Sequence, residues 1–335
     1  MDKKGKKILI IHTAFLGDII LSTPLLSKIS HYYTDCKIYY LTTPLGAEIL
    51  QHHPHIEHFI IYDKRGKDKG FRGWLRILKQ IKKEHFDIVF ALHRYLKTTL
   101  FAYFSNAYIR IGYNIAFLNK LFTKRVIYVK KKHEVERLLS FVEPIDDPDY
   151  SIALFPDNAD FQIVQQWLSA DFNGKRITIA PESQWFTKQW LWEYFQILVE
   201  KLSKIENLQI VIVGQKKDNL FSNSKNIIDL RGKTSLSQWM AVIAMSDVLV
   251  SNDSASVHIA SAFPSVKIHA IFGPTIKEFG FYPWSQNSVI HEVSGLPCRP
   301  CGIHGSNRCK KKHFKCMKNI LPQTVFDAIC TSLKI

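Results

Sequence analysis

The sequence predicts an α/β protein made of two Rossmann-like, doubly wound domains, and three observations support this fold class. The chain has 335 residues, which is long for one hydrophobic core, so two domains of about 150 residues each are expected. Hydrophobic residues make up 46% of the chain and charged residues 22%, as in ordinary globular proteins. In both halves, short apolar segments alternate with amphipathic ones, which is typical of parallel sheets covered by helices.

The first half begins with an apolar run at residues 6–11, the pattern of a parallel strand that is buried on both faces. The apolar positions after Asp18 suit a helix, with Pro24 near its first turns, where proline is tolerated. Further elements are predicted in chain order as a strand at 37–41, a helix at 45–52, a strand at 58–62, a helix at 73–84 and a strand at 87–92. Such a sheet binds ligands outside the carboxyl ends of its strands.

A linker is expected at residues 143–160, which are rich in proline and aspartate and poor in periodic apolar residues. The domains then span residues 1–155 and 170–320, and the last helix is an element that could pack back on the first domain. The second half repeats the alternation, with strands predicted at 176–180, 208–214, 248–251 and 266–272 and helices at 191–205, 236–246 and 255–262. Two such domains facing a central cleft make up a GT-B architecture.

The formal net charge of +16 implies an anionic partner, which can be nucleic acid, a membrane surface or an acidic substrate. The basic residues are spread out and lack the aromatic signature of RNA-recognition motifs and any zinc-finger spacing, so nucleic acid is disfavoured. The apolar runs fall far short of the roughly 20 residues that span a bilayer. Gly17 and Asp18 interrupt the apolar stretch near the N-terminus, which argues against a signal peptide. We therefore expect a cytoplasmic protein.

Two segments that follow apolar strands carry candidate functional groups. Asp18 follows the first strand, where a carboxylate could act as general base on an attacking hydroxyl, although Asp also favours a helix N-cap. The segment 250–258 begins a helix, whose exposed N–H groups attract phosphate. There Ser254 offers a hydroxyl and His258 lies one turn along the same face. The alternative is simple capping by Asp253 or Ser254, with His258 as a core histidine.

A third candidate segment follows the predicted strand that ends at Ala180. It offers Ser183, Thr187 and Lys188 before a helix rich in aromatic residues. The ammonium group of Lys188 could neutralise a diphosphate leaving group in place of a metal ion. An exposed lysine before an aromatic core face is the competing interpretation.

Taken together, these motifs resemble glycosyltransferase family 9, and within it the ADP-heptose:lipopolysaccharide heptosyltransferase II branch. The similarity runs from residue 6 to about residue 327. Its most specific stretches are FLGD at 15–18, TKQW at 187–190, RGKTSL at 231–236, SNDS at 251–254 continuing to His258, and FGPT at 272–275. Departures from the family pattern are Glu182 for a small residue, Gln189 for a basic residue, Leu191 for proline and Ala255 for glycine.

The resemblance implies an inverting, metal-independent transfer of heptose from ADP-heptose to the lipopolysaccharide inner core, with Asp18 as the base. The second domain would bind the donor through Ser183, Thr187, Lys188, Asp218, Asp253, Ser254 and His258. The first domain would bind the acceptor through Lys97 and Arg137, with Lys64 and Arg65 as weaker candidates whose alternative role is a solvated charged loop. No cofactor is required, because the ADP-sugar is a substrate. The expected partners are a lipid A–Kdo–heptose acceptor and the cytoplasmic surface of the inner membrane.

Four of the six cysteines are close together near the C-terminus. Cys298, Cys301, Cys309 and Cys316 form a C-x2-C-x7-C-x6-C array, which is not a standard zinc-ribbon spacing. A structural zinc ion, reduced thiols and disulfides are the alternatives for this cluster, and for a cytosolic enzyme metal or free thiols are favoured over disulfides. In each case the cluster is expected to be structural.

Two other functions are compatible with the sequence. One is a family-9 transferase of another sugar, because the residues that select the sugar cannot be identified from the sequence. The other is a non-catalytic protein that binds nucleotides or polyanions. A dinucleotide oxidoreductase is disfavoured, because residues 12–17 read HTAFLG where G-x-G-x-x-G is expected.

Overall fold

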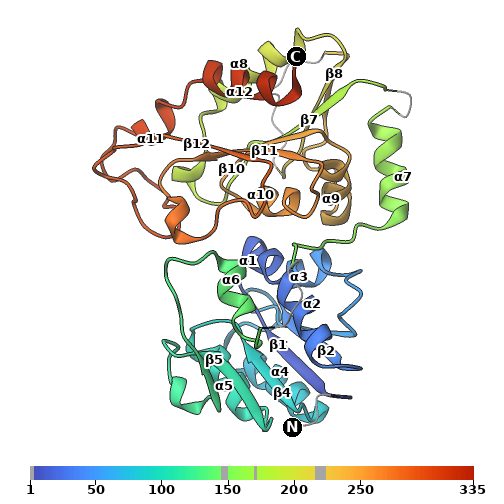
Figure 1. Cartoon of the computed structure of the whole chain (residues 1–335), viewed down its shortest axis with the longest axis vertical. Helices are drawn as coiled ribbons and strands as arrows, with labels where there is room; N and C mark the ends of the chain where they lie inside the picture. The colour runs from blue at the N-terminus through green and yellow to red at the C-terminus, as the bar shows by residue number, and fades with distance from the viewer. Residues whose placement is uncertain (1–3, 145–149, 170–171, 216–223) are drawn as a thin grey trace. The chain divides into compact units, whose positions relative to one another are not determined.

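The computed structural model describes residues 4–144, 150–169, 172–215 and 224–335. The chain divides into two compact units, Met1–Phe155 and Pro156–Ile335, each with one six-stranded sheet (Figure 1). The division falls inside the segment 143–160, where the sequence suggests a linker. Within the described ranges, none of the helices has both the length and the apolar character that crossing a bilayer requires.

The first sheet is entirely parallel, with strand order β3-β2-β1-β4-β5-β6. Its central strands β1 and β4 are covered on both faces, so their side chains are apolar without alternation. The strand bounds are β1 Lys7–Ile11, β2 Lys37–Thr42, β3 His58–Ile61, β4 Ile88–Ala91, β5 Ile109–Tyr113 and β6 Lys124–Val126.

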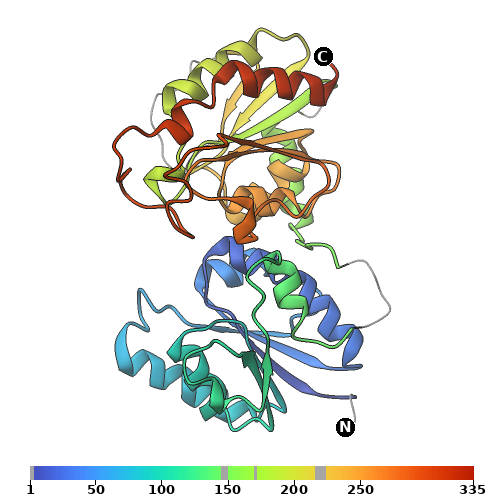
Figure 2. The same cartoon turned by 60° about the vertical axis from the view of Figure 1, so that its left-hand side comes forward.

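Helices cover both faces of the first sheet. Helices α4 and α5 pack together on one face, whereas α2 and α6 pack together on the other (Figure 2). The helix bounds are α1 Leu16–Leu21, α2 Thr23–Tyr32, α3 Pro44–Ile49, α4 Gly70–Glu84, α5 Leu96–Phe104 and α6 Glu134–Leu139, with a 3-10 turn η1 at Asn119–Leu121. The one helix predicted after Asp18 is in fact two, which meet at Ser22. Pro24 lies in the first turn of α2, where its missing N–H costs no hydrogen bond.

The second sheet repeats the topology of the first, because its order is β12-β11-β10-β7-β8-β9 and all its strands are parallel. Strand β7 therefore corresponds to β1, and β10 corresponds to β4. The bounds are β7 Lys175–Ala180, β8 Leu208–Ile212, β9 Ile227–Asp229, β10 Val248–Asn252, β11 Lys267–Phe272 and β12 Ser288–Glu292.

The helices of the second unit also lie on both sides of their sheet. Helices α8 and α12 run side by side over one face, and α9 and α10 lie on the other (Figure 2). The bounds are α7 Asn158–Trp167, α8 Trp192–Ser203, α9 Leu236–Ala244, α10 Ala255–Ala260, α11 Lys315–Lys318 and α12 Pro322–Leu333, with 3-10 turns η2 at Phe186–Lys188 and η3 at Lys277–Phe279.

The last helix belongs to the core of the second unit. Val325, Ile329 and Leu333 of α12 pack in one apolar cluster with Phe195 and Leu198 of α8. The expectation that this helix could pack back on the first domain is not met by its apolar stripe, which is buried against α8 in the second unit.

Both units are doubly wound, so the prediction of two Rossmann-like domains is confirmed. In each sheet the direction of winding reverses between two adjacent strands, which are β1 and β4 in the first unit and β7 and β10 in the second. Ligands of doubly wound sheets bind at this switch point, outside the carboxyl ends of the strands. The candidate residues are therefore expected to lie at these two edges.

Candidate functional site

In the second unit, three loops that follow adjacent strands are joined at the switch point. Asn252, the last residue of β10, is completely buried. Its Oδ1 accepts the backbone N–H of Trp190 at 2.9 Å, and its Nδ2 donates to the carbonyl oxygen of Pro181 at 2.6 Å. One amide side chain thus fixes both ends of the loop after β7 to the end of β10.

A charged cluster lies where these loops meet. The ammonium group of Lys188 is 2.6 Å from Oδ2 of Asp253, and the two side chains are 14% and 7% exposed. The hydroxyl of Thr275, in the loop after β11, donates to the same Oδ2 at 2.6 Å. Lys188 is therefore not the exposed lysine of the competing interpretation, but a largely buried cation held by a carboxylate.

Ser183 and Thr187 lie in the same loop as Lys188. The hydroxyl of Ser183 is 3.5 Å from the carbonyl oxygen of Asp253, and Gln189 donates to the carbonyl oxygen of Ser183 at 2.7 Å. The Thr187 hydroxyl is bonded to the backbone of Ser306 in both directions, accepting at 2.8 Å and donating at 3.1 Å. Thr187 is buried, so its hydroxyl shapes the loop.

Helix α10 begins beside this cluster, but the capping interpretation does not hold there. Ser254 is the N-cap residue and its side chain makes no capping bond. Its hydroxyl lies 3.1 Å from that of Ser251 and 3.2 Å from that of Ser256. The carboxylate of Asp253 is used by Lys188 and Thr275, and His258 is buried in α10.

Two further residues near the predicted donor site are Asp218 and Glu182. Asp218 lies outside the described residues. Glu182, one of the departures from the family pattern, accepts the backbone N–H of Gln215 at 2.9 Å. Its carboxylate therefore bridges the loops after β7 and β8, which is a role that a small residue could not fill.

In the first unit, Asp18 lies at the corresponding edge, after β1. It is the third residue of α1, whereas the N-cap of this helix is Phe15. Asp18 is half-buried and does not cap the helix, so the second of its two interpretations is wrong. The loop before it is held by Lys64, whose ammonium group donates to the carbonyl oxygen of Thr13 at 2.5 Å.

Cationic side chains gather near this loop. Partial burial of its ammonium group is the main cause of the lowered pKa of Lys64, and repulsion from Arg65 and Lys97 adds to it. Burial also lowers the pKa of His93 to about 3, with a contribution from Lys64. The structure thus brings Lys64, Arg65 and Lys97 together, beside an imidazole that is neutral at physiological pH.

Arg137 has a different environment. Its side chain is 1% exposed and pairs with Glu134 at 2.6 Å. Its Nη1 donates to the carbonyl oxygens of Lys130 and Lys132, and its guanidinium lies 5.2 Å from the ring of Tyr128. Arg137 therefore holds the loop before α6 in place, in contrast to the direct grip on an acceptor that the resemblance implies.

Three residues of these edges are not among the candidates predicted from the sequence. Thr275 and Asn252 lie inside the motifs given above, but neither was assigned a role. Arg94 was not singled out at all, and its guanidinium stacks over Tyr128 at 4.8 Å. Asn252 ends an apolar strand, and Arg94 and Thr275 each lie three residues after one, which is the signal that the sequence offers.

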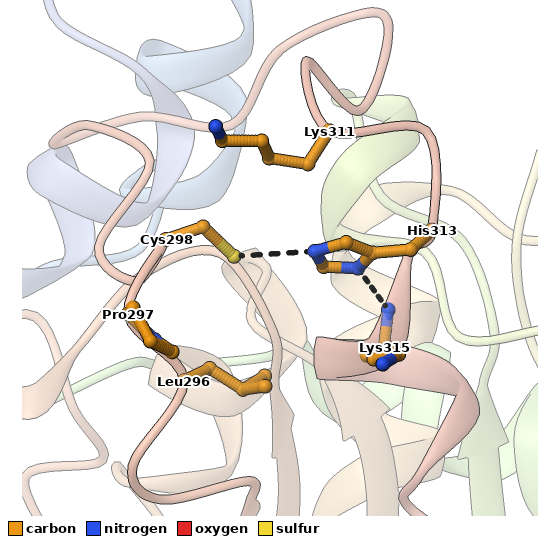
Figure 3. A pocket seen from close by; sticks show the side chains of 6 residues that line it. All are labelled: Leu296, Pro297, Cys298, Lys311, His313 and Lys315. Atoms are coloured by element: carbon orange, nitrogen blue, oxygen red, sulfur yellow. Dashed lines mark hydrogen bonds between the residues drawn. The ribbon is translucent and has the colours of Figure 1, made fainter.

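The cysteine cluster lies in the segment that connects β12 to α12. Cys298 lines a surface cavity of about 340 Å³ together with Leu296, Pro297, Lys311, His313 and Lys315 (Figure 3). Its Sγ points toward Nε2 of His313 at 3.7 Å, and Nδ1 of that ring accepts the backbone N–H of Lys315 at 3.0 Å (Figure 3). This pattern leaves the proton of the neutral imidazole on the nitrogen that faces the thiol.

All six cysteines are free thiols. Among the residues that the structure describes, no group of three or more histidine, cysteine, aspartate or glutamate side chains is arranged to hold a metal ion.

Comparisons with known proteins agree with this geometry. The model of glycosyltransferase family 9 (heptosyltransferase) matches residues 74–313. The lipooligosaccharide heptosyltransferase 2 of Campylobacter jejuni is 26% identical over an alignment of 337 positions, which covers 96% of this chain and 98% of that protein. The lipopolysaccharide core heptosyltransferase OpsX of Haemophilus influenzae is 24% identical over 287 residues, covering 80% of each chain.

Solved structures show the same fold. A family-9 glycosyltransferase from Veillonella parvula superimposes with a TM-score of 0.82 at 22% identity, over 99% of this chain and 98% of that one. The Escherichia coli ADP-heptose lipopolysaccharide heptosyltransferase II gives 0.78 at 19% identity, over 98% of both chains. The predicted GT-B fold class is thereby confirmed. Since the family model covers well over half of the sequence, this chain belongs to glycosyltransferase family 9 and is a glycosyltransferase.

Proposed function

We propose that this chain transfers a heptose from ADP-heptose to the inner core of lipopolysaccharide, as an inverting, metal-independent enzyme of the heptosyltransferase II type. Similarity to a lipooligosaccharide heptosyltransferase 2 along nearly the whole chain supports this reaction. The observation that carries the proposal is the buried cluster of Lys188, Asp253 and Thr275 at the switch point of the second sheet. Nucleotides bind at this place in doubly wound folds.

In this proposal the second unit binds the donor. The ammonium group of Lys188 neutralises the charge that develops on the ADP leaving group, where a buried cation is more effective than one in water. Ser183, Asp253 and Ser254 are assigned to the lining of the nucleotide-sugar site, Thr187 and His258 to its support from within the unit, and Asp218 is assigned to it from the resemblance alone. Escherichia coli heptosyltransferase WaaC has been solved with ADP and with ADP-2-deoxy-2-fluoro heptose, which supports an ADP-sugar as the donor class.

The chemical step is assigned to Asp18. Its carboxylate accepts the proton of the acceptor hydroxyl while the hydroxyl oxygen forms a bond to the anomeric carbon. The bond from that carbon to the diphosphate breaks on the opposite side, ADP leaves with the bonding electrons, and the anomeric configuration is inverted. The half-buried position of Asp18 after β1 supports this role, because it is not used as a helix cap.

The first unit is proposed to bind the acceptor. Lys64, Arg65 and Lys97 form a cationic group close to the loop that leads to Asp18, which suits a phosphorylated or carboxylated sugar chain. Arg137 supports the same edge from inside the unit. The net charge of +16 favours attraction to the anionic inner face of the cytoplasmic membrane, where the acceptor is expected.

A second candidate is a heptose transferase that acts at another position of the core. The relatives include lipopolysaccharide heptosyltransferases 1 and 3 at 24% and 25% identity, close to the 26% of the type 2 enzyme. Transfer of another sugar by the same machinery is the third possibility. A panel of acceptors and ADP-sugars separates these candidates from one another.

The test is release of ADP from ADP-heptose, with and without a Kdo–lipid A acceptor that already carries one heptose. We expect release that depends on the acceptor, that persists in the presence of a chelator, and that falls by about 10²-fold or more in Asp18→Asn. Asp35→Asn, which removes an exposed carboxylate of the same unit, is the matched control and should retain activity. Binding of ADP without any turnover of the panel would instead favour a non-catalytic nucleotide-binding protein.

A further inference from the structure

The segment between β12 and α12 contacts the donor loop that contains Lys188. The backbone N–H of Thr187 donates to the carbonyl oxygen of Ser306 at 3.0 Å, in addition to the two bonds of its hydroxyl. The rings of Phe186 and Phe314 stack with their centroids 5.4 Å apart. The 3-10 turn η2 is thus held by residues more than one hundred positions further along the chain.

The fit between the two segments is close at Gly305. A Cβ atom at this position would lie 2.4 Å from Cβ of Trp185 and 3.0 Å from Cγ of Lys188. Real side chains do not approach so closely, so only glycine allows this backbone to pass beside the lysine. The stem of Lys188 therefore packs directly against the segment that follows β12.

The same segment holds the loop after β11. The backbone N–H of Cys301 donates to the carbonyl oxygen of Pro274 at 2.9 Å. The side chain of Arg299 is 6% exposed, and its Nε and Nη2 both donate to the carbonyl oxygen of Thr275, at 3.2 and 2.6 Å. Nη2 also pairs with Glu292 at 2.5 Å, while Nη1 donates to the carbonyl oxygen of Val293 at 2.9 Å.

These contacts form a continuous chain to the cation of the donor site. Arg299 holds the backbone of Thr275, the hydroxyl of Thr275 donates to Oδ2 of Asp253, and the same oxygen pairs with Lys188. We propose that Arg299 is a positioning residue for donor binding, which fixes the ammonium group of Lys188 through Thr275 and Asp253. The role of the donor site itself rests on the proposed function.

The geometry of the side chain explains why arginine is needed. A guanidinium is a rigid planar fork with five N–H donors, and here it donates to three acceptors, on Thr275, Val293 and Glu292. A lysine would keep the charge near Glu292 but presents a single point charge on a flexible stem. Arg299→Lys therefore preserves the charge and removes the fork.

The first readout does not depend on the identity of the donor. Amide hydrogen exchange in peptides that cover residues 186–190 and 274–276 should be faster in Arg299→Lys than in the wild type by about tenfold. The matched control is Arg308→Lys, which changes an exposed arginine of the same segment and should leave exchange in both peptides unchanged. Faster exchange that is confined to residues around 292–300 would overturn the proposal.

The second readout is the affinity for ADP, measured by calorimetry. We expect Arg299→Lys to weaken binding by about tenfold, the effect of losing a hydrogen bond to a charged group, with no comparable change in Arg308→Lys. If the wild type binds no ADP, the proposed function fails, and the exchange experiment alone decides whether Arg299 positions the loops. ADP affinity that is unchanged in Arg299→Lys contradicts the proposal.

A double-mutant cycle tests the path should Arg299→Lys fold poorly. Thr275→Val removes the hydroxyl that reaches Asp253 but keeps the carbonyl that Arg299 holds. We expect it to weaken ADP binding, and Thr275→Ser to restore the affinity. If Arg299 acts through Thr275, the two losses are not additive in the double variant, whereas independent effects would add.

Discussion

Nζ of Lys188 lies 2.6 Å from Oδ2 of Asp253, and this ion pair joins two loops that are 65 positions apart in the chain. Both side chains are largely buried, so each charge depends on the other for its stabilisation. Lys188 and Asp253 belong to two separate sequence motifs, at 187–190 and 251–254, and the ion pair places them in direct contact.

Removing the carboxylate should destabilise the second unit. Asp253→Asn leaves the ammonium group of Lys188 buried without its counter-charge, which costs about 3 kcal/mol of unfolding free energy. Chemical denaturation of the folded chain measures this loss. The control is Glu200→Gln, which breaks an exposed pair with Lys204 and should change stability by less than about 1 kcal/mol. Equal stability of the two variants would mean that the buried pair contributes little.

Replacing the cation should mainly affect donor binding. In Lys188→Met the apolar stem is retained but the charge that faces the proposed diphosphate is lost. ADP affinity measured by calorimetry should fall by about tenfold or more, as for other charged hydrogen bonds. Lys204→Met, at an exposed position of the same unit, should bind ADP as the wild type does. Retention of full affinity in Lys188→Met would remove this residue from the donor site.

The cationic group of the first unit, Lys64, Arg65 and Lys97, should affect binding of the acceptor and leave binding of ADP unchanged. Lys97→Ala is expected to raise the KM for the acceptor about tenfold and to weaken the salt dependence of turnover, while ADP affinity is unchanged. Steady-state kinetics at two ionic strengths checks both effects. The exposed Lys120 provides the control variant, Lys120→Ala. A change in the ADP affinity of Lys97→Ala would contradict the assignment of Lys97 to acceptor binding.

Stability should fall as the pH drops below about 6.5, because buried histidines resist protonation. Burial lowers the pKa of His269 to about 3 and that of His291 to about 4. The two rings also contact each other, with Nδ1 of His269 3.0 Å from Nε2 of His291. Below pH 6.5 the unfolded chain takes up protons at these positions and the folded chain does not. Each histidine thus removes about 1.4 kcal/mol of stability per pH unit until its own folded pKa is reached.

The variant His291→Gln isolates this contribution. It should reduce the slope of stability against pH between about 6.5 and 4.5 relative to the wild type, as measured by chemical denaturation. Above that range the two proteins should show the same slope. An unchanged slope at acidic pH would show that His291 titrates normally in the folded state.

The thiols of the cysteine cluster should differ in reactivity. Burial raises the pKa of Cys316 to about 11, with added repulsion from neighbouring thiols, and its side chain is buried, whereas Cys301 is exposed. Alkylation near neutral pH followed by mass spectrometry should label Cys301 in the folded protein and leave Cys316 unmodified. Unfolding in denaturant is the control and should make both react. Rapid labelling of Cys316 in the folded protein would contradict its burial.

The regular elements could be predicted wherever periodicity was strong. The strands at the centre of both sheets, β1, β4, β7, β8, β10 and β11, were all predicted with small errors at their ends. The edge strands β6, β9 and β12 and the short strand β5 beside β6 were not predicted, whereas the edge strand β3 was. Edge strands are covered less completely, so their side chains are not uniformly apolar. In β6, for example, only the last residue of Lys124–Val126 is buried.

The fold class and the segments that carry the candidate groups follow from the sequence alone, because burial on both faces of a parallel strand imposes an apolar run that ends where the functional loop begins. The tertiary structure decided how those groups are used. It showed Asp18 inside α1, Arg137 buried in an ion pair, and Lys188 bound to Asp253. It also joined Arg299 to Thr275 across 24 positions. Such contacts depend on which strands become neighbours, and hydrogen bonds between distant loops leave no periodic pattern in a single sequence.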